Sequence, residues 1–252
     1  MEDISETYWQ KLAQSRIYFG HQSVGENILE GVNDILSTRR AIALRIVQGT
    51  SPDDLDPPAF LHSTIGRNGD PFSKIDAFQR VLEAAIGEKA DIAMVKFCFV
   101  DIAENTDVSS LFRYYRERME FLKKKFPNLR IVHVTVPLMT IPGGMINEGK
   151  RLIKCLLGKS DERSQSNQKR IQYNDLLVNE YGGNEPLFDL ALLESTYPDG
   201  SRCARHYGSA KIYSLAPEYT PDGGHLNADG RKKAAEQLLI VLAETAAAQS
   251  SR

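Results

Sequence analysis

Short apolar runs and longer amphipathic segments alternate along almost the whole chain. The runs that suit strands are residues 16–20, 41–47, 91–100, 129–137 and 186–190. The segments with apolar residues at helical spacing are residues 23–36, 72–86, 108–126, 168–181 and 227–246. Strands that alternate with helices in this way predict a mainly parallel sheet, with right-handed crossovers and helices on both faces. The sequence therefore predicts an α/β fold, a three-layer α/β/α sandwich around a five-stranded sheet.

The length and net charge of the chain indicate a single domain and exclude a strongly basic, nucleic-acid-binding surface. Its 252 residues suit a single domain, residues 1–252, with a core large enough to need no disulfide or metal. Lys and Arg total 31 while Asp and Glu total 33, so the net charge is −2. Such a balance provides no basic surface for a polyanion, and we expect no nucleic-acid partner. The sequence does not indicate an oligomeric state.

The first residues and the cysteines favour a cytoplasmic location. Glu2, Asp3 and Glu6 stand where a secretory signal would have basic and then apolar residues, although a signal removed from a precursor would leave no trace here. The cysteines number 3 and lack zinc-type spacing, so free thiols in a reducing compartment are the simplest interpretation. The apolar stretches 92–100 and 238–248 are shorter than the roughly 20 residues that a membrane span requires.

Two connections, residues 48–71 and 140–167, are too long to be simple links between neighbouring elements. The second follows the fourth predicted strand and contains Gly143 and Gly144. In a parallel sheet this position lies at the carboxyl edge, where ligands bind. We therefore expect residues 140–167 to form a flap insertion over a binding site.

The segment Gly20–Gly25 has the sequence Gly-His-Gln-Ser-Val-Gly and joins the first predicted strand to the first predicted helix. A hydroxyl at such a turn is presented at a helix N-terminus, where Ser23 could act as a nucleophile. The same serine followed by Glu26 also fits a capping box, in which its hydroxyl only satisfies a backbone amide. The motif by itself favours capping, so the serine needs a catalytic partner.

The segment 222–227, Asp-Gly-Gly-His-Leu-Asn, supplies a partner just before the last predicted helix. An aspartate three residues before a histidine can turn back to bind Nδ1 of the imidazole, which leaves Nε2 as a base. The alternative is a solvent-exposed turn with no chemistry. Because the carboxyl ends of parallel strands share one edge, we expect Asp222, His225 and Ser23 to lie together.

At these two segments the sequence resembles the SGNH, or GDSL-like, hydrolases, which are flavodoxin-like α/β/α esterases and acylhydrolases. Ser23 matches the nucleophilic serine of the first family block, although Gly-His-Gln-Ser replaces the usual Gly-Asp-Ser. Asp222 and His225 match the acid and base of the closing Asp-X-X-His block. Gly66 falls where the family has the glycine whose amide helps to bind the oxyanion.

The third family block, Gly-X-Asn-Asp, is altered, because residues 98–101 are Cys-Phe-Val-Asp. Val100 takes the place of the asparagine that completes the oxyanion hole in the family. We expect Asn68 to supply the missing donor, because its carboxamide has N–H groups, whereas Val100 has no side-chain donor and an ionised Asp101 carboxylate only accepts. Asp101 then either contacts the substrate or only caps a turn. We also expect His21 and Gln22, which precede Ser23, to contact the substrate.

The resemblance implies ester hydrolysis through a Ser23–His225–Asp222 triad, acting on acyl or acetyl esters that include those of carbohydrates. Two alternatives remain open: an O-acyltransferase that acts on sugar hydroxyls, and a module that binds carbohydrate or acyl ligands without catalysis. Asp189, at the end of the fifth predicted strand, is a rival acid or a turn former.

We expect neither a metal nor any other cofactor. Three histidines lack companions at metal-ligand spacing, and no phosphate-binding glycine motif is present. These histidines are His62, His133 and His206. Lys96 lies inside an apolar strand, where we expect it to pair with a carboxylate.

Overall fold

The computed structural model describes residues 5–39, 42–141, 162–207 and 210–249. Its centre is a parallel sheet of six strands in the order β2-β3-β1-β4-β5-β6. In that order the strands are β2 Ile46–Gln48, β3 Phe60–Thr64, β1 Ile17–His21, β4 Ile92–Val95, β5 Arg130–Val134 and β6 Leu187–Phe188. A separate antiparallel pair consists of β7 Ala204–Tyr207 and β8 Ala210–Tyr213. The expected α/β/α sandwich is confirmed.

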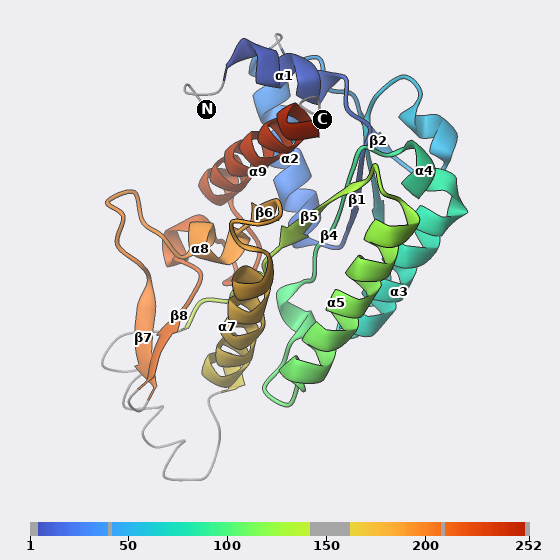
Figure 1. Ribbon diagram of the computed structural model, residues 1–252. Coiled ribbons are helices and arrows are strands. Elements are labelled where there is room, and N and C mark those ends of the chain that lie inside the picture. Colours follow the sequence, from blue (N-terminus) through green and yellow to red (C-terminus); the bar gives the residue numbers. More distant parts are fainter. Residues whose placement is uncertain (1–4, 40–41, 142–161, 208–209, 250–252) are drawn as a thin grey trace.

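Helices cover both faces of the sheet (Figure 1). One face carries α1 Glu6–Ala13, α2 Val24–Thr38, α8 Leu190–Glu194 and α9 Ala228–Gln249. The other carries α3 Pro71–Val81, α5 Val108–Lys125 and α7 Glu162–Tyr181. Short helical segments are Pro52–Leu55, Leu82–Ile86, α4 Gly87–Lys89, Phe99–Asp101 and Pro217–Tyr219. No helix in the described ranges is long and apolar enough to cross a membrane.

Residues of the central strands alternate between two hydrophobic cores. On β1, Ile17 and Phe19 pack into the core under α2 and α9, whereas Tyr18 packs into the core under α3 and α5. All five residues of β1 are buried. This is the pattern of a strand covered on both faces, and it fixes which side chains leave the sheet at its carboxyl edge.

The sheet has six strands rather than the expected five, because β3 lies inside the segment 48–71 that we expected to be a loop. Its polar residues His62 and Ser63 interrupt the apolar pattern in the sequence. Both are buried between neighbouring strands, where Ser63 Oγ lies 2.8 Å from Tyr18 Oη. Strand β3 pairs with β1 in parallel, so the loop that follows it begins beside the end of β1.

The expected flap, residues 140–167, falls mostly at residues 142–161, which lie outside the described residues. Its last part, from Glu162, is the start of α7 and belongs to the helical layer. The flap therefore stays a prediction for residues 142–161.

Candidate functional site

The candidate site lies at the carboxyl edge of the three central strands. Strand β1 ends at His21, β3 ends at Thr64 and β4 ends at Val95. Because β1 pairs with both β3 and β4, the turn that contains Ser23 lies between the two loops that follow these neighbours. This edge is where open parallel α/β sheets bind ligands.

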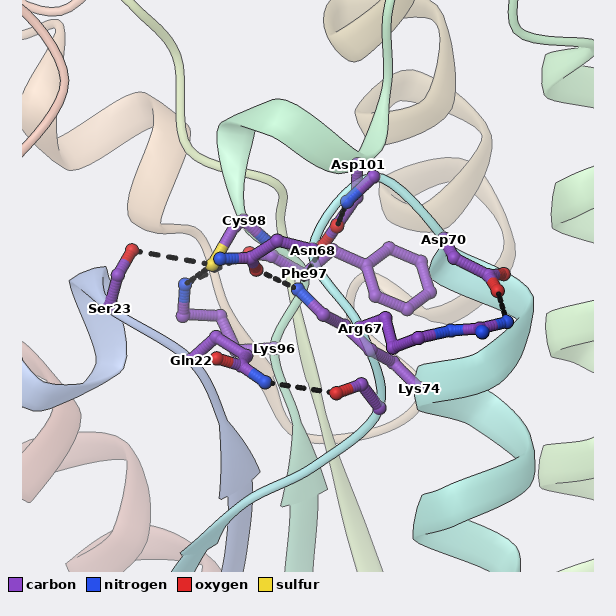
Figure 2. A network of polar contacts seen from close by, with 12 residues as sticks. Gln22, Ser23, Arg67, Asn68, Asp70, Lys74, Lys96, Phe97, Cys98 and Asp101 are labelled. Carbon is purple, nitrogen blue, oxygen red and sulfur yellow. Dashed lines mark hydrogen bonds and ion pairs between the residues drawn. The ribbon is translucent and has the colours of Figure 1, made fainter.

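Ser23 has a strained backbone and a side chain that does not cap its helix. Its φ is 27° and its ψ is −84°, a region that residues with a Cβ rarely occupy. It stands at the N-cap of α2 but makes no side-chain capping hydrogen bond. Instead, Ser23 Oγ lies 3.6 Å from Cys98 Sγ, on the loop after β4 (Figure 2). The turn thus directs the hydroxyl toward the sheet edge and away from the helix.

Asp222 holds His225 in a fixed orientation. The Asp222 carboxylate lies 2.7 Å from His225 Nδ1, and its other oxygen accepts the backbone amides of His225 at 2.8 Å and Gly224 at 2.9 Å. These hydrogen bonds, with the His225 amide as the largest contribution, hold the pKa of Asp222 well below its usual value. The carboxylate is therefore ionised at neutral pH and fixes Nδ1 as the protonated nitrogen, which leaves Nε2 for proton transfer.

The loop that carries His225 is attached to the helix that begins after Ser23. The Leu226 amide donates to Asn27 Oδ1 at 3.2 Å, and the Asn27 amide donates to Ser23 O at 3.2 Å. Two hydrogen bonds thus connect the serine turn to the residue after the histidine, which brings the two sequence motifs to one place.

Both motifs contact the same dipeptide on the loop after β4. Ser23 approaches Cys98, while the His225 ring meets the Phe99 ring edge to face with centroids 5.6 Å apart. No hydrogen bond joins Ser23 directly to His225 in the described part of the chain. Catalytic hydrogen bonds are often long or absent without substrate, so this separation is compatible with a dyad that closes on binding.

Gln22 holds the loop that contains Gly66. Its side-chain amide donates to Ile65 O and to Gly66 O, both at 3.1 Å. Gly66 has φ +61°, and a Cβ at this position would lie 2.7 Å from the backbone of Lys74. The amide nitrogen of Gln22 is therefore used to position the loop, while the Gly66 N–H donates to no group within the residues described.

Asp101 is buried and ties three segments together. It accepts the Lys74 ammonium at 2.5 Å, the Cys98 amide at 2.6 Å and the Gly69 amide at 2.8 Å. The residue is only 3% exposed. Both carboxylate oxygens are occupied beneath the loop, which does not favour the expected substrate contact, and that contact stays a prediction. Asp101 instead acts on the site through Lys74, which also donates to Asn68 Oδ1 at 2.9 Å.

Asn68 is exposed, and among the described residues only its side-chain carbonyl oxygen has a hydrogen-bond partner. Lys74 fixes that oxygen, which leaves the two amide hydrogens available for a ligand. In Figure 2 the amide end of Asn68 points toward Cys98 and Ser23. Val100, in contrast, is 44% exposed and has no side-chain donor. The geometry thus favours Asn68 over Val100 as a donor.

His21 is completely buried and pairs with a second histidine. Its Nε2 lies 3.0 Å from Nδ1 of His62, on the neighbouring strand β3. Burial, then the neighbouring His62 and Lys96, lower the pKa of His21 to about 3, and burial also lowers the pKa of His62. No part of His21 reaches the surface, so its burial does not favour the expected contact with the substrate, which stays a prediction.

Lys96 and Lys74 are buried cations whose roles the sequence did not show. Lys96 Nζ donates to Phe97 O at 3.0 Å and lies 3.6 Å from Cys98 Sγ, rather than pairing with a carboxylate as expected. Burial lowers the pKa of Lys96. Lys96 lies in an apolar run, and this position indicates an unusual environment. Lys74 lies in an amphipathic helix, where a lysine is ordinary, so the sequence gives no sign of its burial.

Asp189 does not compete with Asp222 for His225. It stands at the N-cap of α8, where it accepts the Leu192 amide at 3.0 Å and the Thr135 hydroxyl at 3.0 Å. The interpretation of Asp189 as a turn former is confirmed.

Comparison with solved structures identifies the fold. A GDSL-like lipase from Bacteroides thetaiotaomicron is 12% identical, covers 95% of this chain and 99% of its own, and gives a TM-score of 0.57. A protein assigned as a GDSL-like lipase from Parabacteroides merdae is 13% identical, covers 91% and 95% of the two chains, and gives a TM-score of 0.52. The chain has the SGNH, or GDSL-like, fold. No known sequence family and no curated protein sequence matches it.

The SGNH-like fold is shared over nearly the full length at very low sequence identity. Such a likeness establishes the arrangement of strands and helices. It does not establish an activity, which has to be argued from the residues at the carboxyl edge of the sheet. The candidate residues of this SGNH-like chain, Ser23, Gly66, Asn68, Asp222 and His225, all lie on connections at the carboxyl edge of the sheet or just before the last helix.

Proposed function

We propose that this chain is a serine hydrolase that cleaves carboxylic esters. The observation that carries the proposal is the Ser23 turn: the structure retains an unfavourable φ of 27° and gains no capping hydrogen bond from it. Strain of this kind persists where the surrounding structure imposes it, and it is concentrated at functional sites. An Asp–His pair attached to the same helix supplies the base.

In the proposed reaction, Ser23 Oγ forms a bond to the carbonyl carbon of the ester while its proton moves to His225 Nε2. Asp222 stabilises the imidazolium that results. The tetrahedral intermediate then expels the alcohol, which takes the proton from His225, and an acyl group remains on Ser23. Water attacks this acyl-enzyme with His225 again as base, which releases the carboxylic acid and restores the serine.

The oxyanion would be bound by three donors, the amides of Ser23 and Gly66 and the side-chain amide of Asn68. Neither of the two backbone amides donates to another group among the residues that the structure describes. Preorganised donors of this kind stabilise the charge that develops in the transition state. The Phe99 ring adds apolar surface beside His225, and the next residue, Val100, is exposed, which suits an acyl chain.

A fluorophosphonate probe tests the nucleophile. We expect mass spectrometry to place the adduct on Ser23, and Ser23→Ala to lower hydrolysis of a short acyl ester by roughly 10³-fold or more. Ser37→Ala, an exposed serine on the same helix, is the matched control and should retain activity. An adduct on another residue, or full activity in Ser23→Ala, would contradict the proposal. Adding a sugar alcohol as acceptor shows whether water or a hydroxyl receives the acyl group.

A further inference from the structure

Two buried histidines on neighbouring strands face each other behind the Ser23 turn. His21 ends β1 and His62 lies on β3, and His21 Nε2 is 3.0 Å from His62 Nδ1. Glu26, in the first turn of α2, places its carboxylate 4.0 Å from the same His21 nitrogen. The three potential ligand atoms all lie within 4.8 Å of one another. Three separate elements thus direct two imidazoles and a carboxylate to one point.

The spacing of these atoms suits a tetrahedral metal ion. Zinc binds imidazole nitrogen and carboxylate oxygen at about 2.0 to 2.2 Å, so two ligands of one zinc ion lie roughly 3.3 Å apart. The separations of 3.0 Å and 4.0 Å fall on either side of this value. The Glu26 side chain is 53% exposed and can turn inward to close the remaining gap.

We propose that His21, His62 and Glu26 bind one Zn²⁺ ion. The two imidazoles would coordinate through His21 Nε2 and His62 Nδ1, and Glu26 would coordinate through one carboxylate oxygen. Two imidazoles and one carboxylate form a donor set suited to zinc and unsuited to Mg²⁺ or Ca²⁺, which prefer oxygen ligands. Three protein ligands leave a fourth position for water.

The two nitrogens that face each other, His21 Nε2 and His62 Nδ1, share one hydrogen bond. A metal ion would take the place of this hydrogen bond, because each nitrogen would then direct a lone pair to the ion.

The charges around the pair make Glu26 essential to binding. Lys96 and Lys74 both act on His21 by repulsion of positive charge, although Lys74 is neutralised by its ion pair with Asp101. The Glu26 carboxylate is the negative group that acts on His62. A divalent cation would therefore depend on Glu26 for charge compensation as well as for a ligand.

Zinc at this position would join the elements that position the candidate site. Strand β1 leads into Ser23, β3 leads into the Gly66 loop, and α2 begins directly after Ser23. The first turn of α2 already packs closely on the histidine, since a Cβ on Gly25 would lie 2.4 Å from His21 Cβ. The ion would act as a cross-link that holds the serine turn in place, and we expect zinc to raise the melting temperature.

Zinc binding to the full chain, stripped with a chelator, tests the proposal without any assay of activity. We expect calorimetry to give one Zn²⁺ per chain, and Co²⁺ to give the visible spectrum of a four-coordinate site. Glu26→Gln, at an exposed position that should not disturb folding, and His62→Gln should each weaken Zn²⁺ binding by about tenfold or more. His206→Gln, at an exposed position on β7, is the matched control and should bind as the wild type does.

The proposed site would be wrong if the wild type bound no Zn²⁺, or if Glu26→Gln and His62→Gln both bound it with unchanged affinity. Loss of Zn²⁺ binding in Cys98→Ala would also contradict the site, because it would place the metal on the Cys98 thiol. Ser23→Ala should bind zinc normally. The outcome is therefore separate from that of the ester-hydrolase proposal, because a chain without esterase activity can still bind the ion, and an active esterase can fail to bind it.

Discussion

The Lys74 ammonium lies 2.5 Å from the Asp101 carboxylate, and neither side chain has any exposed surface. Lys74 also donates to Asn68 Oδ1, and Asp101 accepts the Gly69 amide from the same loop. This buried ion pair thus supports the exposed Asn68 from below.

Lys74→Met should destabilise the chain strongly. The substitution leaves the Asp101 carboxylate buried without its cation, and breaking a buried ion pair typically costs about 3 to 5 kcal/mol. Urea unfolding measures the change. Lys89→Met is the control, because Lys89 pairs with Asp56 at the exposed surface and should show no comparable loss. Equal stability of the two variants would contradict a structural role for the buried pair.

Asn68→Ala should lower kcat by about 10² to 10³, with little change in KM or melting temperature. The reason is that Asn68 is exposed and would contribute a donor only to the transition state. Steady-state kinetics on a short acyl ester provide the measurement. Asn184→Ala, an exposed asparagine elsewhere, should leave kcat unchanged. Wild-type kcat in Asn68→Ala would remove Asn68 from the oxyanion hole.

Ser23→Gly should be more stable than Ser23→Ala by about 1 kcal/mol, although both variants should be inactive. Glycine tolerates the observed φ of 27°, whereas alanine keeps the strain of a Cβ in this region. Both variants lack the hydroxyl, so the difference between their free energies of unfolding reports the backbone strain alone. Chemical denaturation of the two variants checks it, and equal stability would show that the turn stores no strain.

Glu194→Gln should gain stability relative to the wild type as the pH rises from 5 to 8. Burial raises the pKa of Glu194 from 4.5 to about 8. The hydrogen bond from the Leu138 amide and the charges of Lys96 and Arg170 oppose this shift, and Asp189 adds a smaller effect in the same direction as burial. The folded state therefore binds the proton more tightly than the unfolded chain does. This stabilisation is complete below pH 4.5 and is lost as the pH approaches 8, by about 1.4 kcal/mol per unit.

The difference between Glu194→Gln and the wild type cancels the pH dependence of all other groups, and urea unfolding at four pH values measures it. A difference that does not change with pH would show that Glu194 titrates normally in the folded chain.

The layers of the fold and the Asp222–His225 pair were predictable from the sequence, because both depend on local order along the chain. Apolar periodicity reports which elements form and how they alternate. The aspartate and histidine are three residues apart, so a single glycine turn brings the carboxylate to the imidazole.

The support of Asn68 and the meeting of His21 with His62 were decided only by the tertiary structure. His21 and His62 are separated by 41 residues and meet because β1 and β3 pair in parallel, and β3 itself was hidden by its polar side chains. Lys74, on α3, reaches Asp101, in the short helix after β4, across 27 residues. Side chains brought together by strand pairing have no periodic signature in the sequence, since the register between strands depends on the packing of the whole sheet.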